Sequence, residues 1–303
     1  PPPPPPPPRF SSRRRHTRLA ILSRGLGDVY KRQSWDDLRV EDREQGPVLY
    51  IMVRDADGRL VRQVAATTDA GLHRTAWDLR LPPPDPVSIA PAEDRPYWMS
   101  DPAGPLVLPG TYTARLGVER DGVLEEVGDT VSFTVKSLDA SPEITSDRKA
   151  LQDFQVRVAG LQRAVQGSSR AMGELQNRLA HVRAAIPVTP AATDAERDVL
   201  RQLEKRLANV EVALRGDDTI GGRNEPVPMS IASRVSSLYN RLVYSQSAVG
   251  GNYRDSYEVA AQEFSVALQS LRTLAADVRA LEDALELKGA PWTPGRIPDW
   301  SKE

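Results

Sequence analysis

Of the side chains that enzymes use for catalysis, cysteine is absent and histidine is rare in this sequence, and the others form no familiar motif. Cysteine is absent, which excludes a thiol nucleophile, a disulfide and Cys-ligated zinc. The three histidines, His16, His73 and His181, lie far apart and have no neighbours in a metal-ligand spacing. We therefore predict no catalytic residue, no metal site and no cofactor in this chain.

Three adjacent acidic pairs are the remaining candidates for acid–base chemistry. They are Asp36-Asp37, Glu125-Glu126 and Asp217-Asp218. Glycoside hydrolysis needs two carboxyl groups that face each other across the scissile bond. Side chains adjacent in sequence need not converge, so we expect solvated loops here. The sequence also lacks a P-loop, a dinucleotide fingerprint and a Ser-His-Asp spacing.

An aromatic pair is the first of two candidate binding features. Tyr97 and Trp98 lie in a proline-rich segment at the edge of the predicted β domain. An exposed aromatic pair offers a flat apolar platform that can stack on a sugar ring. The same two side chains could instead pack on their own domain or on a neighbouring one.

A glycine-rich loop between two predicted helices is the second candidate. Gly221, Gly222 and Arg223 lie in this loop, whose backbone amides could form an anion-binding nest. The alternative is a structured helix connector in which Arg223 pairs with an acidic side chain.

Residues 46–137 carry the alternation and turn chemistry of a β domain. Strands are predicted at residues 48–53, 59–65, 71–79, 110–118 and 131–135. Gly58 and Gly122 mark turns because glycine readily adopts positive φ. Trp77 is the predicted anchor of the core. Several short strands separated by turns predict an Ig-like or fibronectin-like β-sandwich.

Residues 141–289 carry apolar side chains at alternating three- and four-residue spacings, which is the pattern of a helical seam. Helices are predicted at about residues 147–186, 194–215, 230–242 and 251–285. Short connections between amphipathic helices predict an antiparallel four-helix bundle. Residues 290–303 form a predicted C-terminal tail, pinned to the bundle by Trp292 and Trp300. The predicted fold class is therefore multidomain α+β in separate domains, with the β-sandwich followed by the antiparallel α-helical bundle.

The charge of the chain is unevenly distributed. Residues 1–32 hold eight Lys/Arg and one acid, so the remaining chain, with 32 basic and 40 acidic residues, is acidic by about eight charges. This balance argues against a nucleic-acid surface on the folded part. No apolar run reaches the length of roughly 18 to 20 residues that a membrane span needs.

The first 33 residues resemble translated sequencing-adapter sequence rather than a designed targeting signal. Eight prolines precede SSRRRHTRLAILSRGLGDVYKRQ, and the apolar stretch within it is too short for a secretory signal. We expect residues 1–45 to be a disordered or artefactual tail and linker, and the natural protein to extend further upstream.

Several motifs carry a resemblance to one group of bacterial proteins. The segments IMVRDADGRLVRQV, AGLHRTAWDLR and PGTYTARL resemble an Ig-like module of the flagellar hook-capping type. The segments GGRNEPVP and GAPWTPGRIPDW resemble the C-terminal region of secreted sialidase-like or sortilin-like BNR-repeat propeller proteins, which are labelled glycosyl hydrolases. The resemblance implies a secreted or periplasmic location and the order propeller, Ig-like module, helical bundle. The propeller's Asp-box motif is not found in this sequence.

These observations predict a non-catalytic C-terminal accessory region that acts as a spacer and protein-interaction module. The expected partners are the upstream β-propeller of the same chain, and a second copy or another protein bound by the bundle. Any enzymatic activity would then belong to the propeller. The alternative is a carbohydrate-binding module of a secreted glycosidase, with a glycan at Tyr97 and Trp98.

Overall fold

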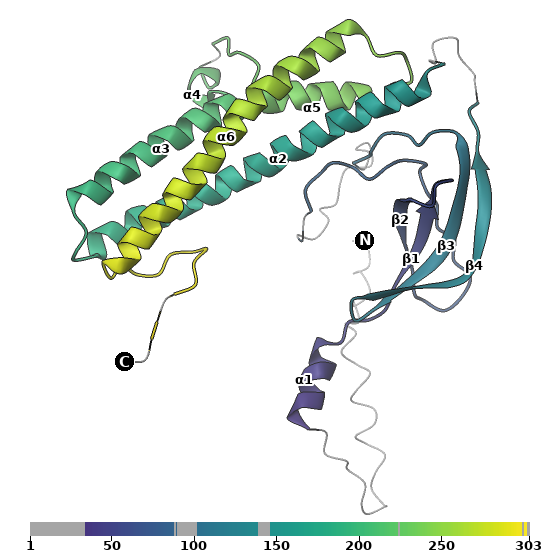
Figure 1. The fold of residues 1–303 in the computed structure, drawn as a ribbon, viewed down its shortest axis with the longest axis horizontal. Helices are drawn as coiled ribbons and strands as arrows, with labels where there is room; N and C mark the ends of the chain where they lie inside the picture. Colours follow the sequence, from purple (N-terminus) through teal and green to yellow (C-terminus); the bar gives the residue numbers. More distant parts are fainter. Residues whose placement is uncertain are drawn as a thin grey trace, which may run out of the picture. The chain divides into compact units, whose positions relative to one another are not determined.

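The protein is of mixed α+β type, with a four-stranded antiparallel sheet and a helical region (Figure 1). The computed structural model describes residues 34–87, 89, 102–138, 146–223, 225–298 and 300–301. The chain divides into two compact units, Pro1–Pro47 with Arg120–Val123 and Val48–Glu119 with Leu124–Glu303. Residues 1–33 of the predicted tail lie outside the described residues.

The first unit contains helix α1 (Trp35–Arg43), which lies in a range predicted to be tail and linker. The helix begins with a capping box, because Ser34 accepts from the Asp37 amide and Asp37 accepts from the Ser34 amide. All of its side chains lie on the surface. The spacing of Ser34 and Asp37 favours a helix start, and the sequence-based prediction of a tail and linker did not use it.

The sheet belongs to the second unit, apart from the tip of one hairpin. Its strands are β1 (Val48–Arg54), β2 (Leu60–Ala66), β3 (Gly110–Arg120) and β4 (Val123–Val135), in the order β2-β1-β3-β4. The predicted β1–β2 hairpin is confirmed, and Gly58 in its turn has φ 78°. In the register of the central strand, Ile51 lies between Val64 and Leu116.

The predicted strand at residues 71–79 is wrong. Residues 72–78 are described but pair with no strand, and Leu79 has φ 59°, which ends any extended run. Residues 79–81 instead form an isolated bridge with residues 105–107, because the Leu81 amide donates to the Pro105 carbonyl and the Val107 amide donates to the Leu79 carbonyl. The described residues form one sheet, and β4 begins eight residues earlier than predicted, at Val123.

Three aromatic rings fill the core beside the sheet. Trp77 packs edge-on against Tyr112 and Phe133, with ring centroids 5.8 and 6.3 Å away. Val53 and Val107 are buried in the same cluster, so the prediction of Trp77 as a core residue is confirmed. Leu116, on the same face of β3 as Tyr112, remains 42% exposed. The core therefore covers one end of the sheet.

The four predicted long helices are present within one or two residues of their predicted bounds. The helices and the short 3-10 segment are α2 (Arg148–Ala185), η2 (Ile186–Val188), α3 (Asp194–Arg215), α4 (Asp218–Gly221), α5 (Ile231–Leu242) and α6 (Gly251–Leu287). The start of α3 is a capping box of Thr193 and Glu196, and Gly216 ends that helix with φ 103°. Helix α4 and segment η2 were not predicted.

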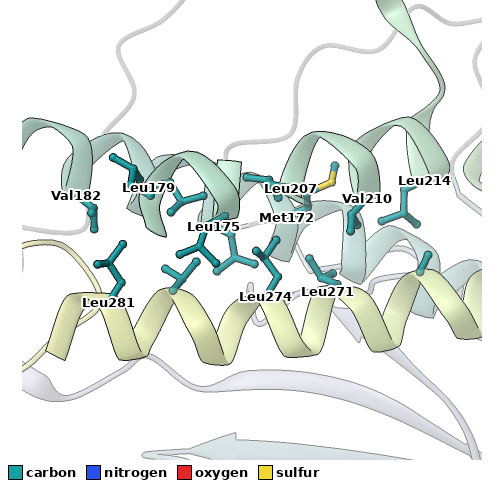
Figure 2. Packing of buried hydrophobic residues seen from close by; sticks show 14 of the residues in the cluster. Met172, Leu175, Leu179, Val182, Leu207, Val210, Leu214, Leu271, Leu274 and Leu281 are labelled. Atoms are coloured by element: carbon teal, nitrogen blue, oxygen red, sulfur yellow. The ribbon is translucent and has the colours of Figure 1, made fainter. Parts of the chain in front are cut away.

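The seams of α2, α3 and α6 pack into one apolar core (Figure 2). Its labelled members are Met172, Leu175, Leu179, Val182, Leu207, Val210, Leu214, Leu271, Leu274 and Leu281. Helices α3 and α6 run antiparallel, because Glu196 pairs with Lys288 while Arg206 pairs with Asp277. Helix α5 packs against α2 and α6.

Candidate functional site

Tyr97 and Trp98 lie outside the described residues. Their predicted sugar-stacking role therefore stays a prediction. The three residues of the predicted anion nest are described and lie around the end of α4. The Gly221 amide donates to the Asp217 carbonyl, the Gly222 amide to the Asp218 carbonyl, and the Arg223 amide to the Ile220 carbonyl. An anion here would have to compete with these backbone hydrogen bonds, and its binding also stays a prediction.

The adjacent acidic pairs serve local structure. Asp37 completes the capping box of α1, and Asp217 accepts from the first amides of α4. Glu126 pairs with Arg54 at 2.5 Å and with Arg115 at 3.4 Å. The hydrogen bond from Arg54 holds the pKa of Glu126 below its usual value.

The described histidines have ordinary surroundings. His73 is exposed, and the Nδ1 atom of His181 lies 2.8 Å from the Asn177 carbonyl one turn earlier on α2. Within the described ranges, no group of three or more His, Asp or Glu side chains is arranged to hold a metal ion. No helix among the described residues is both long enough and apolar enough to cross a membrane.

A wide groove lies between α3 and α6, and we call it the α3–α6 groove. It has a volume of about 1110 Å³ and continues over the segment that joins α4 to α5. Its apolar lining includes five side chains that are exposed to solvent: Val212, Ile220, Met229, Val259 and Val266. Met229 is 56% exposed and Val266 is 66% exposed. Apolar side chains exposed side by side in a groove are typical of a binding surface.

Two interhelical ion pairs join α3 to α6, one at an end of this groove and one beyond that end. Arg206 and Asp277 join α3 to α6 at 2.6 Å, and Lys288 joins the end of α6 to Glu196 at the start of α3, also at 2.6 Å. The hydrogen bond from Lys288, helped by the Thr193 amide, lowers the pKa of Glu196 to about 2. Both ion pairs lie on the side of the groove where α3 begins and α6 ends, and neither lies at the opposite end, near Gly216 and Val259.

The charges along the groove are unequal at its two ends. At one end Arg206 is neutralised by Asp277. At the other end lie Asp217, which caps α4, and Glu263, whose carboxylate is 3.8 Å from the Arg234 Nε atom. Arg234 offsets the charge of Glu263, so the second end carries a net negative charge from Asp217.

The sequence did contain a signal for the groove, although it was not used. Val212, Val259 and Val266 fall outside the a/d seam of their helices, where a polar residue is expected on a solvated face. What the sequence could not supply was the packing of α3 on α6, which brings these three valines onto one surface.

The C-terminal tail is held differently from the prediction. Trp292 is 60% exposed and Trp300 is 81% exposed, so these rings do not pin the tail by burial. Arg296 does so instead, because its Nη1 atom donates to the Glu282 carbonyl at 2.6 Å and its guanidinium also pairs with Glu286. Thr293 is buried beside it.

The acidic residues described above are engaged in caps and ion pairs, and the α3–α6 groove combines a hollow with exposed apolar side chains. The chain has no significant match to any protein-family model, curated protein or solved structure. A functional assignment therefore depends on the groove itself.

Proposed function

We propose that this chain is a non-catalytic accessory region of a secreted, sialidase-like β-propeller protein. In this proposal an Ig-like β-sandwich acts as the spacer, and an antiparallel four-helix bundle binds a protein partner. The confirmed β1–β2 hairpin and the antiparallel course of α3 and α6 support the two architectures. The observation that carries the function is the α3–α6 groove, with its exposed apolar side chains on fixed helices.

The occupant that best fits the α3–α6 groove is an amphipathic helix of the partner. Along α6 the groove lining extends over residues 259–273, which is about 21 Å at 1.5 Å per residue, or about four helical turns. An apolar helix face in a groove between two helices is a common mode of peptide recognition. The acidic end at Asp217 and Glu263 favours Lys or Arg at the corresponding end of the partner.

A designed peptide tests this proposal. We would titrate the full chain, by calorimetry, with a 15-residue amphipathic helix that has leucines on one face and lysines in its last turn. A twin peptide with glutamates in place of the lysines is the charge control. We expect micromolar binding of the lysine peptide and at least tenfold weaker binding of the twin, because like charges would meet at Asp217 and Glu263.

Variants of the chain locate the binding. Val266→Lys should weaken binding of the lysine peptide at least tenfold, because it places a charge in the apolar groove. Val156→Lys is the matched control, since Val156 is also an exposed helical valine but does not line the groove. An equal loss of peptide affinity in both variants would contradict the proposed site. Unchanged affinity in Val266→Lys would also contradict it.

The non-catalytic part of the proposal has its own test. The purified full chain should release no fluorophore from a panel of fluorogenic glycosides, including a sialoside, above the rate of a buffer blank. Turnover that scales with protein concentration and survives further purification would contradict it.

A further inference from the structure

A second hollow lies on the same pair of helices as the α3–α6 groove. It has a volume of about 350 Å³, and its lining comes entirely from α3 and α6. Along α6 this lining extends from Asp277 to Ala284, whereas that of the groove extends from Val259 to Thr273. Arg206 of α3 lines both hollows. Because α3 and α6 run antiparallel, the two hollows follow one another along a single seam.

The lining residues of this seam recur at alternating spacings of four and three residues on both helices. On α6 they include Val259, Glu263, Val266, Ser270, Thr273, Asp277, Ala280 and Ala284. On α3 and at its C-cap they include Ala195, Val199, Gln202, Arg206, Asn209, Ala213 and Gly216. A seven-residue repeat of this kind keeps one stripe of a helix turned towards a single partner helix. Since the inner seams of α3 and α6 already fill the core, these residues form an outer stripe that is available to a further helix.

The outer stripe changes in character along its length. Val259 and Val266 make it apolar at the groove end, where both are exposed. Val199, Ala280 and Ala284 make it apolar at the other end, and Val199 is 41% exposed. Its middle is polar, with Ser270, Thr273 and Asp277 on α6 and Gln202, Arg206 and Asn209 on α3. A helix that covers the whole stripe therefore needs apolar residues towards both ends and a polar residue between them.

The polar middle contains hydrogen-bonding groups that a partner can reach. The Arg206 Nη1 atom donates to the Asp277 carboxylate at 2.6 Å, and these two side chains remain 43% and 44% exposed. The side-chain amides of Gln202 and Asn209 are exposed and form no hydrogen bond with any described residue. An apolar side chain over these groups would remove them from water without replacing their hydrogen bonds. A neutral side chain that both donates and accepts, such as asparagine, fits here because the charges of the ion pair cancel.

The described part of the chain offers no free helix that could cover the stripe. From residue 259 to residue 284 of α6 the stripe is about 38 Å long at 1.5 Å per residue, or about seven helical turns. Among the described helices α2 and α6 alone are that long, and their apolar seams are buried in the core. A second copy would have to open its own core to supply such a helix. The occupant is therefore a helix of a different protein.

We propose that the outer stripe binds one helix of a partner protein, about 26 residues long, with an asparagine or glutamine over the Arg206–Asp277 pair that sets its register. A single polar residue in an apolar helical seam specifies register in this way in coiled coils. The inference rests on the proposed function, since the α3–α6 groove is one end of the stripe. It adds the length of the partner helix and the polar residue that this helix must carry.

Three peptides test length and register by calorimetry with the full chain. The first is the 15-residue lysine peptide. The second extends it to 26 residues at the end away from the lysines and has an asparagine about 27 Å from the lysine end, opposite Asp277. The third is identical to the second but has leucine in place of the asparagine. We expect the asparagine peptide to bind at least tenfold more tightly than the 15-residue peptide and at least fivefold more tightly than the leucine peptide.

The outcomes separate this inference from the proposed function. If the 15-residue peptide binds and the extension adds no affinity, the inference is overturned and the proposed function stands. A leucine peptide that binds as tightly as the asparagine peptide would overturn the assigned role of the Arg206–Asp277 pair. Absence of binding by all three peptides would contradict the proposed function itself, and this inference with it.

Variants in the second hollow locate the extension. Ala284→Lys places a charge there and should remove the tenfold gain, while the affinity of the 15-residue peptide stays unchanged. Val199→Lys, on the α3 side of the hollow, should have the same effect. Ala276→Lys is the matched control, because Ala276 is an exposed alanine of α6 outside both linings. Loss of the gain in this control, or persistence of the gain in both hollow variants, would overturn the inference.

Replacement of the ion pair should reverse the preference for the middle residue of the peptide. In the double variant Arg206→Leu, Asp277→Leu the middle of the stripe becomes more apolar, so the leucine peptide should bind more tightly than the asparagine peptide. A preference for asparagine that persists in this double variant would overturn the role of the pair in setting the register.

Discussion

The most deeply buried charge described in the helical region is a single carboxylate. Glu282 on α6 has no exposed surface, and both of its oxygens accept from Arg178 on α2, at 3.0 and 2.5 Å. This bidentate geometry raises the pKa of Arg178, chiefly through the hydrogen bond to Glu282. Because Arg296 donates to the Glu282 backbone carbonyl, the same position also holds the C-terminal tail.

Removal of one partner from this pair should be costly. Arg178→Ala leaves the Glu282 carboxylate buried and unpaired, and we expect a loss of about 3–5 kcal/mol in urea unfolding. The double variant Arg178→Met, Glu282→Leu should recover most of that loss, since no charge then remains buried. A single variant as stable as the unchanged chain would show that the pair is not formed.

The ion pair between Glu196 and Lys288 predicts a pH dependence. The pKa of Glu196 falls from 4.5 to about 2 in the folded protein, mainly through the Lys288 hydrogen bond. A lowered folded-state pKa contributes stability above the unfolded value, and that stability is lost as pH falls from about 4.5 towards 2. Glu196→Gln should therefore flatten the pH dependence of the unfolding midpoint in this window, whereas Lys288→Arg should preserve it.

At the scale of elements, the helices could be predicted because their start signals are local. The Thr193 side chain and the Glu196 carboxylate satisfy the first amides of α3 using residues only three positions apart. We expect Thr193→Ala to cost about 1 kcal/mol in thermal unfolding, and Thr193→Ser to cost much less. Equal stability of the two variants would mean that the cap does not hold α3.

Substitution of a buried leucine in the apolar seam should have a larger effect on the free energy of unfolding. Leu175 is 4% exposed in the core shared by α2, α3 and α6, so Leu175→Ala should lower the free energy of unfolding by about 2–5 kcal/mol. Val156→Ala, at an exposed position of the same helix, should change it by less than about 0.5 kcal/mol. If Leu175→Ala left the free energy of unfolding unchanged, this result would contradict the apolar packing shown in Figure 2.

The β domain was harder to predict, because strands depend on distant partners. Residues 71–79 alternate as a strand should, yet they join no strand, and residues 79–81 close a loop by pairing with residues 105–107. Gly104 shows how tight that loop is: a Cβ atom there would lie 2.2 Å from the Leu81 carbonyl oxygen. This close approach is a property of the folded loop, and alternation within one segment cannot reveal it.

At the scale of the whole molecule, the candidate sites depend on packing between elements far apart in sequence. The valines of the α3–α6 groove come from two helices whose contact no single-helix pattern specifies. The sequence therefore predicted the helices well and the α3–α6 groove not at all.

The most direct test of the proposed function is methyl NMR of the valine-labelled full chain during titration with the lysine-bearing peptide. We predict progressive shifts of the Val212, Val259 and Val266 methyl signals, with little change at Val48 and Val131 on the sheet. Shifts at the sheet valines in the absence of shifts at the groove valines, or no shifts at saturating peptide, would contradict the assignment of this chain as a protein-interaction region that acts through the α3–α6 groove.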